Sequence, residues 1–206
     1  PTYPGEKITV TCSWKAKSIF ITADESGNWK GRMSTPAAGG PYSIKIKGNN
    51  LIELNDVLIG EVWVCSGQSN MVFTLKSADH AKEEIAKADR PNIRYFSVAR
   101  QYGPDLFKDC PGSVWEKTSP QNAGSFSAVA YYFARMIQDS LKVPVGLVYS
   151  AWGGTPAEAW TPKKALQQND QLALYIERWK AIQDNAGKDS SAYHKALDDW
   201  EKIKQA

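Results

Sequence analysis

Hydrophobic and polar residues alternate in short runs over the first part of the chain. Four runs show this period of two, and turn-forming segments such as 25–28 and 48–50 separate them. Alternation of this kind is typical of strands with one face in a core and the other in solvent. We therefore predict that residues 1–60 form a small antiparallel β-sandwich-like module, with strands at 8–12, 18–22, 42–47 and 51–54.

The pattern changes at residues 61–65, which are almost entirely apolar. A short continuous apolar run is typical of a strand that is buried on both faces, as in a parallel sheet. Further strands are expected at 92–98 and 145–149, with helices at 78–88 and 126–141 between them. Strands that alternate with helices predict an α/β fold, in which helices flank a parallel sheet.

Helical periodicity continues to the end of the chain. In the helix expected at 126–141, one face carries Phe126, Val129, Ala130, Phe133, Ile137 and Leu141. Two more helices are expected, with apolar stripes at 172–182 and 193–203. Three buried strands are few for this fold class, and no glycine or proline ends the last helix. We therefore expect the α/β domain of residues 61–206 to be incomplete at its C-terminus.

Composition excludes several classes of function. The 25 basic and 22 acidic residues give a net charge of +3, which is too weak and too evenly spread for a nucleic-acid surface. No apolar run approaches the roughly 20 residues of a membrane-spanning helix, and the first residues lack the pattern of a signal peptide. Three widely spaced cysteines predict neither a disulfide framework nor a zinc site. We expect no metal, no cofactor, no nucleic acid and no membrane partner, and we expect Cys65 to pack as a small apolar residue.

A serine-centred turn follows the first apolar strand, where residues 61–71 read E-V-W-V-C-S-G-Q-S-N-M. Ligands of open α/β sheets bind at the carboxyl ends of the strands, which is where Ser69 is placed. If a helix begins at Asn70, its free N–H groups face whatever Ser69 attacks. The hydrolase elbow Gly-x-Ser-x-Gly is disfavoured, because Met71 stands in place of its second glycine. The plain alternative is a strand-to-helix connection with Ser69 as the helix cap.

A second polar turn follows the strand at 145–149, where residues 150–160 read S-A-W-G-G-T-P-A-E-A-W. This turn should lie at the same edge of the same sheet as Ser69. The glycine pair Gly153-Gly154 would let backbone approach a bound group and present an N–H to it. An ordinary tight turn is the alternative.

Together the two segments resemble a known family. G-Q-S-N-M at 67–71, followed by P-V-G-L-V-Y-S-A-W-G-G-T-P-A-E-A-W at 144–160, is similar to the sialate O-acetylesterase group of the SGNH hydrolases, to which acetylxylan esterases are related. Residues 126–130 and the β-rich entry into the first motif are also similar. The resemblance covers about residues 5–165 and implies the N-terminal portion of an SGNH, flavodoxin-like α/β enzyme.

The resemblance implies a role for each motif residue. Ser69 would attack the acetyl group of an O-acetylated carbohydrate, most plausibly sialic acid, and form an acetyl-serine intermediate. The N–H groups of Ser69 and Gly153 would hold the oxyanion, with Gly154 as the next candidate. Three residues would support or line the sugar site, although each could equally serve only turn packing: Gln68, Asn70 and Trp152.

No residue of the chain matches the catalytic base of the family, an Asp-x-x-His motif late in the sequence. Ser77 precedes His80 at that spacing and Ser191 precedes His194, so both histidines are expected to be surface residues. The resemblance therefore implies that the catalytic His and Asp come from a remaining C-terminal part of the same protein. This chain alone should be nearly inactive.

Two other functions remain as alternatives. One is an acetylxylan esterase, which these residues do not distinguish from a sialate esterase. The other is a non-catalytic carbohydrate-binding module, which would explain the eight tryptophans and the N-terminal strands but requires no serine-centred turn. A metal-dependent deacetylase is disfavoured because no His/Asp cluster has ligand spacing. The substrate class alone indicates an extracytoplasmic location, either periplasmic or secreted.

Overall fold

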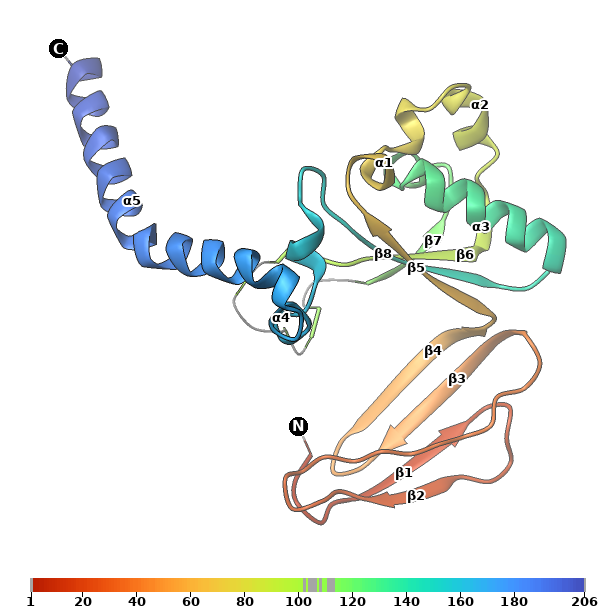
Figure 1. The fold of residues 1–206 in the computed structure, drawn as a ribbon. Helices are drawn as coiled ribbons and strands as arrows, with labels where there is room; N and C mark the ends of the chain where they lie inside the picture. Colours follow the sequence, from red (N-terminus) through yellow and green to blue (C-terminus); the bar gives the residue numbers. More distant parts are fainter. Residues whose placement is uncertain (1, 102, 104–106, 108, 111–113, 206) are drawn as a thin grey trace. The chain divides into compact units, whose positions relative to one another are not determined.

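The computed structural model describes residues 2–101, 103, 107, 109–110 and 114–205. The chain forms two compact units, residues 1–153 and 154–206. Both β-sheets belong to the first unit, and the second unit is helical (Figure 1). The domain boundary predicted after residue 60 falls inside the first unit, between its two sheets, and stays a prediction.

The N-terminal sheet is antiparallel, as predicted. Its strand order is β2-β1-β3-β4, and the core on one face contains Ile8, Val10, Cys12 and Ala23. The last strand is longer than the predicted 51–54, because it continues through a β-bulge at Asn55 and Asp56. The four strands are β1 (Lys7–Cys12), β2 (Ile19–Thr22), β3 (Gly39–Lys47) and β4 (Leu51–Ile59).

The second sheet has the order β5-β8-β6-β7. β8 pairs in parallel with both β5 and β6, so the predicted α/β fold with a preceding antiparallel sheet is confirmed. β7 is antiparallel to β6, which makes the sheet mixed, and the sequence reading missed this short strand. The bounds are β5 (Glu61–Gly67), β6 (Arg90–Ser97), β7 (Trp115–Thr118) and β8 (Val145–Ala151).

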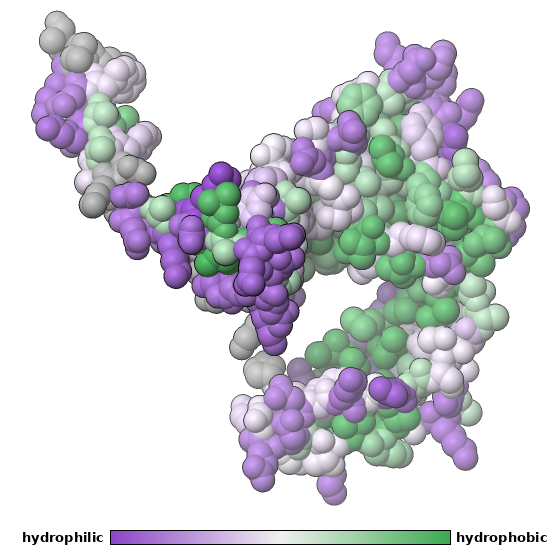
Figure 2. Space-filling view, viewed as in Figure 1, coloured by the Kyte–Doolittle hydropathy of each residue, from purple (hydrophilic) through white to green (hydrophobic). Residues whose placement is uncertain are grey.

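The prediction that residues 61–65 are buried on both faces is wrong for most of the strand. β5 is an edge strand, and the exposed fractions of Val62 and Val64 are 64% and 71%. Trp63 and Cys65 point to the other face of the strand, where Cys65 is buried as expected. Trp63 makes an edge contact with Phe133 of helix α3 (Ala128–Leu141), which covers part of this face. Hydrophobic side chains gather where β5 and α3 lie (Figure 2). An apolar run therefore indicates that a strand has hydrophobic faces, but it does not predict how many of its residues are buried within the chain.

Short helices connect the strands of the second sheet. They are α1 (Ser69–Val72), η1 (Leu75–Ser77), α2 (Ala81–Ala86) and η2 (Ala123–Ser125). The long helix α3 (Ala128–Leu141) packs on the sheet, but the face expected from its periodicity is only partly correct. The small residues Ala130 and Ala134 are buried beside Tyr131, whereas Val129 and Phe133 are exposed. The alanines allow the helix to approach the sheet closely, so that bulky neighbours are left at the rim.

Ser127 joins α3 to the segment that follows β5. Its hydroxyl accepts a hydrogen bond from the Ala130 N–H at 3.3 Å, which caps the helix, and it donates one to the Met71 sulfur at 3.3 Å. Its own N–H donates to the Tyr95 hydroxyl at 3.2 Å. The Ser127 side chain is 2% exposed, so this buried group is fully used.

The bulge in β4 carries the ion pairs that join the two sheets. Asp56 has φ of 58° there, and its carboxylate pairs with Arg94 of β6 at 3.1 Å and Lys117 of β7 at 2.8 Å. The hydrogen bonds from Arg94 and Lys117 hold the pKa of the Asp56 carboxyl below its usual value. The bulge therefore aims an acidic side chain of one sheet at two basic side chains of the other.

The second unit contains η3 (Ala157–Trp160), α4 (Lys163–Gln167), η4 (Asp170–Leu172) and α5 (Ala173–Gln205). The prediction of two C-terminal helices is wrong, because a single helix of 33 residues carries both apolar stripes (Figure 1, blue). The polar residues between the stripes include no proline, and they continue the helix. Among the described residues, no helix has the length and hydrophobicity that crossing a membrane would require.

Replacing Ser127 with Ala should remove the cap of α3 and its bond to Met71. We expect the free energy of unfolding to fall by about 1 kcal/mol, as for other caps, in urea denaturation of the protein. Ser140→Ala, an exposed substitution in the same helix, is the matched control and should change stability little. Equal stability of the two variants would contradict the anchoring role of Ser127.

Replacing Asp56 with Asn keeps a side chain that tolerates positive φ but removes the charge. Because the folded-state pKa is lowered, the carboxylate contributes stability above its unfolded pKa of about 3.9, and this contribution is lost as pH falls through the folded value. Asp56→Asn should therefore lower stability near pH 7 by up to about 1 kcal/mol, since the pairs are partly exposed. Thermal denaturation at a series of pH values should show the two proteins converging in acid, and a constant difference would contradict the ion-pair account.

Candidate functional site

Ser69 stands at the first position of a helical turn directly after β5. Gln68 is the N-cap of α1, no side chain caps the turn, and Ser69 begins the helix. The alternative in which Ser69 serves as the cap is therefore wrong. Its side chain is exposed, and the N–H of a first helical residue has no carbonyl partner within its own helix. A hydroxyl and a backbone donor are thus available on the same residue.

Gly67 and Met71 fix the conformation of this turn. Gly67 has φ of 150°, a conformation that favours glycine, and a side chain there would also lie 3.3 Å from the Met71 Cβ. Met71 packs against the core, and its sulfur accepts a hydrogen bond from the Ser127 hydroxyl. Met71, which disfavoured the Gly-x-Ser-x-Gly elbow on sequence grounds, therefore anchors the serine turn to the core.

The structure brings the second motif to this turn. β5 and β8 pair in parallel with Gly67 opposite Ala151, and the next N–H along, that of Trp152, donates to the Gly67 carbonyl at 3.0 Å. A Cβ placed on Gly153 would lie 3.8 Å from the Ser69 hydroxyl oxygen and 4.0 Å from its nitrogen. Gly153 therefore lies beside Ser69, with room for about one methyl group between them, as the shared sheet edge predicts.

Gly154 begins the second unit, so the structure gives it no position relative to Ser69. Its φ of 79° is one that favours glycine. Its predicted role as the second oxyanion candidate stays a prediction.

An open hollow of about 400 Å³ lies in front of the serine turn. Gln68 and Asn70, which were expected to line a sugar site, line it on either side of Ser69. The other lining residues are Ser66, Gly67, Met71 and Val129, so none of the lining side chains carries a charge. The exposure of Val129, which the helix pattern placed in the core, has a local reason, because its side chain forms one wall of the hollow.

The chain has two histidines, one in each compact unit. His80 precedes α2, and its ring lies near Asp79 and Glu83 with the side chain 77% exposed. His194 is exposed on α5 and contacts Tyr193. Within the described residues, no histidine or carboxylate hydrogen-bonds the Ser69 hydroxyl, and no group of three or more His, Cys, Asp or Glu residues is arranged to hold a metal ion.

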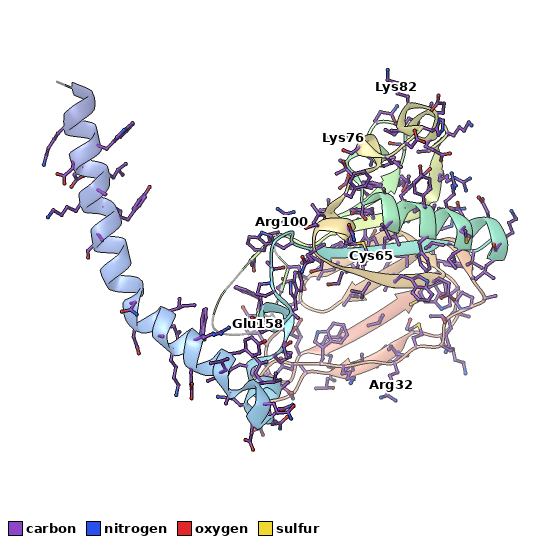
Figure 3. All side chains as sticks on the ribbon, turned by 45° about the horizontal axis from the view of Figure 1, so that its top comes forward. Arg32, Cys65, Lys76, Lys82, Arg100 and Glu158 are labelled. Carbon is purple, nitrogen blue, oxygen red and sulfur yellow. The ribbon has the colours of Figure 1, made fainter. Side chains whose placement is uncertain are left out.

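Cys65 is the other potential nucleophile close to this turn in sequence (Figure 3). It is 5% exposed, and burial raises the pKa of its thiol. A thiol is reactive only as the thiolate, so burial disfavours chemistry at Cys65. The Ser69 hydroxyl, in contrast, is exposed and lines the hollow.

Arg100 and Ser127 had no assigned role in the sequence predictions. The guanidinium of Arg100 lies 5.6 Å from the ring centroid of Trp152, which was expected to line the sugar site. Arg100 lies just beyond β6 in a segment without a motif, so only the three-dimensional pairing of β6 with β8 places it here. Ser127 could have been noticed from the similarity of residues 126–130 to the family, but its bond to Met71 required coordinates.

The chain is similar to known proteins over most of its length. The sialate O-acetylesterase of Rattus norvegicus is 34% identical over 180 residues, which are 79% of this chain and 33% of that protein. The sialate O-acetylesterase of Homo sapiens is 33% identical over 181 residues, which are 80% of this chain and 35% of that protein. The chain thus spans about a third of the length of the curated relatives it matches.

A solved structure shows the same fold. The crystal structure of a carbohydrate acetylesterase from Xanthomonas citri superposes with a TM-score of 0.76 and 34% identity, covering 83% of this chain and 39% of that one. The family described as "Carbohydrate esterase, sialic acid-specific acetylesterase" matches residues 59–195, which include both motifs and the whole second sheet. Because this match extends over more than half of the chain, the chain belongs to the family of sialic acid-specific acetylesterases among the carbohydrate esterases.

Proposed function

We propose that this chain is the nucleophile-bearing part of an SGNH-type serine esterase that removes O-acetyl groups from a carbohydrate. The observation that carries the proposal is the position of Gly153 beside the exposed Ser69, where a Cβ on the glycine would lie 3.8 Å from the Ser69 hydroxyl oxygen. In the proposal, the Ser69 hydroxyl and two backbone N–H groups, those of Ser69 and Gly153, surround one point at the sheet edge. The neutral hollow in front of Ser69 gives an acetylated sugar access to that point.

The proposed chemistry is acyl transfer through serine. The Ser69 oxygen attacks the acetyl carbonyl carbon while a base takes the hydroxyl proton, and the carbonyl oxygen becomes an oxyanion bound by the two N–H groups. Collapse of this intermediate breaks the bond to the sugar oxygen, which receives the proton from the base. Water then attacks the acetyl-serine by the same route and releases acetate.

The base is proposed to come from residues that are not part of this chain. Serine requires such a partner, because its hydroxyl is a poor nucleophile at its ordinary pKa. Neither histidine of the chain has an aspartate at the spacing of the expected motif, since Ser77 precedes His80 and Ser191 precedes His194. The family resemblance supports a histidine and an aspartate in an Asp-x-x-His motif as the missing pair.

Sialic acid is the proposed sugar, because the relatives that match are named sialate O-acetylesterases. An acetylxylan esterase is the alternative within the same chemistry. A non-catalytic carbohydrate-binding module is an alternative of a different class. Such a module has no need of an exposed serine beside a glycine, so this arrangement does not support it. The sugar substrate is also the sole support for the proposed extracytoplasmic location, which fractionation of the native cells would test.

Ser69→Ala should abolish esterase activity. Acetate release from an aryl acetate and from O-acetylated sialic acid should be high only in a form of the protein that continues past residue 206, and the Ser69 variant of that form should lose it. The same variant should no longer react with a fluorophosphonate probe, which labels only activated serines. Ser26→Ala, in the N-terminal module, is the control and should retain both. Full activity of the 206-residue chain would contradict an external base, and labelling of the Ser69 variant would contradict the nucleophile.

Gly153→Ala should lower turnover without unfolding the protein. The added methyl would sit in ordinary contact, 3.8 Å from the Ser69 hydroxyl oxygen, where it would occupy space that the acyl oxygen needs. We expect a loss on the order of 100-fold in kcat, comparable to the loss of one oxyanion donor, with an unchanged Tm. Unchanged turnover would show that the acyl group does not lie between Ser69 and Gly153.

A further inference from the structure

Arg100 contacts Trp152, the residue before Gly153, and has no role in the proposed acyl chemistry. It extends from the segment after β6, and the Val98 N–H donates to the Tyr149 carbonyl at 2.8 Å, which aligns this segment with the end of β8. Its guanidinium lies 5.6 Å from the centroid of the Trp152 ring, and Trp152 directly precedes Gly153. Arg100 is found next to the loop that follows β8 (Figure 3). A short chain of contacts thus links Arg100 through Trp152 and Gly153 to Ser69.

The charge of Arg100 is available for a ligand. Its side chain is exposed, and among the described residues no carboxylate forms an ion pair with it. Three other arginines of the first unit pair with carboxylates: Arg90 with Asp139, Arg94 with Asp56 and Arg135 with Glu84. The side chains that line the hollow are all uncharged. Arg100 is therefore the described positive charge that the contacts connect to the serine turn.

An arginine that lies over an indole ring is prepared to bind an anion. The ring attracts the cation through its face and restricts where the guanidinium lies, while the N–H groups at the edge of the guanidinium plane remain free to donate. Two of these donors match the two oxygens of a carboxylate, and such charge-assisted pairs are among the stronger hydrogen bonds of proteins. The hydroxyl groups of a neutral sugar can also accept hydrogen bonds from arginine, but without the added strength that a charged partner gives.

We propose that Arg100, positioned by Trp152, binds the carboxylate of an acidic O-acetylated sugar and so determines the specificity of the site. This inference rests on the proposed esterase function and adds to it the residue that separates the two substrates left open above. Sialic acid carries a carboxylate that is ionised at neutral pH, whereas acetylated xylan is neutral. Arg100 acts on substrate binding only, and the acyl chemistry belongs to Ser69 and Gly153.

The test compares matched substrates and matched variants in a form of the protein that contains the complete site. The substrates are O-acetylated sialic acid, its carboxamide with the same acetyl group, and an aryl acetate. The variants are Arg100→Gln, Arg100→Lys, and Arg32→Gln as a control with the same loss of charge in the N-terminal module (Figure 3). The kinetic constants kcat and KM are measured for each pair, at low and at high salt.

We expect Arg100→Gln to lower kcat/KM for the acid by roughly 10- to 100-fold, mainly through KM, as for the loss of a charge-assisted hydrogen bond. The carboxamide and the aryl acetate should be hydrolysed as before, so that the preference for the acid disappears. Arg100→Lys should keep part of it, because lysine retains the charge but not the planar pair of donors. High salt should reduce the preference of the unaltered protein, and Arg32→Gln should change nothing.

Two kinetic outcomes would overturn the proposal. An equal loss on all three substrates would make Arg100 a structural residue, and no loss on the acid would remove it from substrate binding. If the protein hydrolyses none of the esters, the proposed function fails first, and this result is separate from the specificity. The binding of N-acetylneuraminic acid, measured by calorimetry on the unaltered protein and on Arg100→Gln, then decides the role of Arg100. Equal affinity, or no binding to either protein, would overturn it.

Discussion

The parallel pairing of β5 with β8 is the constraint on which the site depends. The two strands are far apart in the chain, and their register sets Gly67 opposite Ala151. Each strand is followed at once by a turn, so the register decides which turn residues meet. A one-residue shift along the pair would move Gly153 away from Ser69 and turn the flanking side chains to the other face of the sheet. The proposed chemistry is thus determined by backbone hydrogen bonds before any side chain of the site is considered.

The surroundings of the two turns preserve this register. Met71 and Ser127 tie the serine turn to the start of α3, and Tyr95 accepts a hydrogen bond from Ser127 while it stacks on Phe126 with ring centroids 4.1 Å apart. Burial raises the pKa of the Tyr95 hydroxyl, which therefore stays neutral in this role. The serine turn is exposed, but the residues directly behind it belong to the core of the second sheet. Such a site can present a hydroxyl to solvent and still keep its position.

The sequence predicted the features that have local signals. Alternation and apolar runs located seven of the strands, and the placement of both motifs at the ends of buried-type strands predicted that Ser69 and Gly153 would meet. The sequence did not predict features that depend on residues distant in the chain, or features whose local pattern was ambiguous. The strand β7 (W-E-K-T) has one apolar residue and shows no alternation, the bulge at Asp56 interrupts the alternation of β4, and the two stripes of α5 resembled two helices. Arg100 carries no motif, and only the pairing of β6 with β8 brings it to Trp152.

The central claim is that an acyl oxygen develops its charge between the N–H groups of Ser69 and Gly153. A crystal structure of the protein in a form that extends past residue 206, after reaction with a fluorophosphonate, tests this most directly, because the phosphonyl group imitates the tetrahedral intermediate. The account predicts phosphorus bonded to the Ser69 oxygen, with the phosphonyl oxygen about 2.7–3.1 Å from both nitrogen atoms. A phosphonyl oxygen that points away from Gly153, or an adduct on another residue, would contradict it.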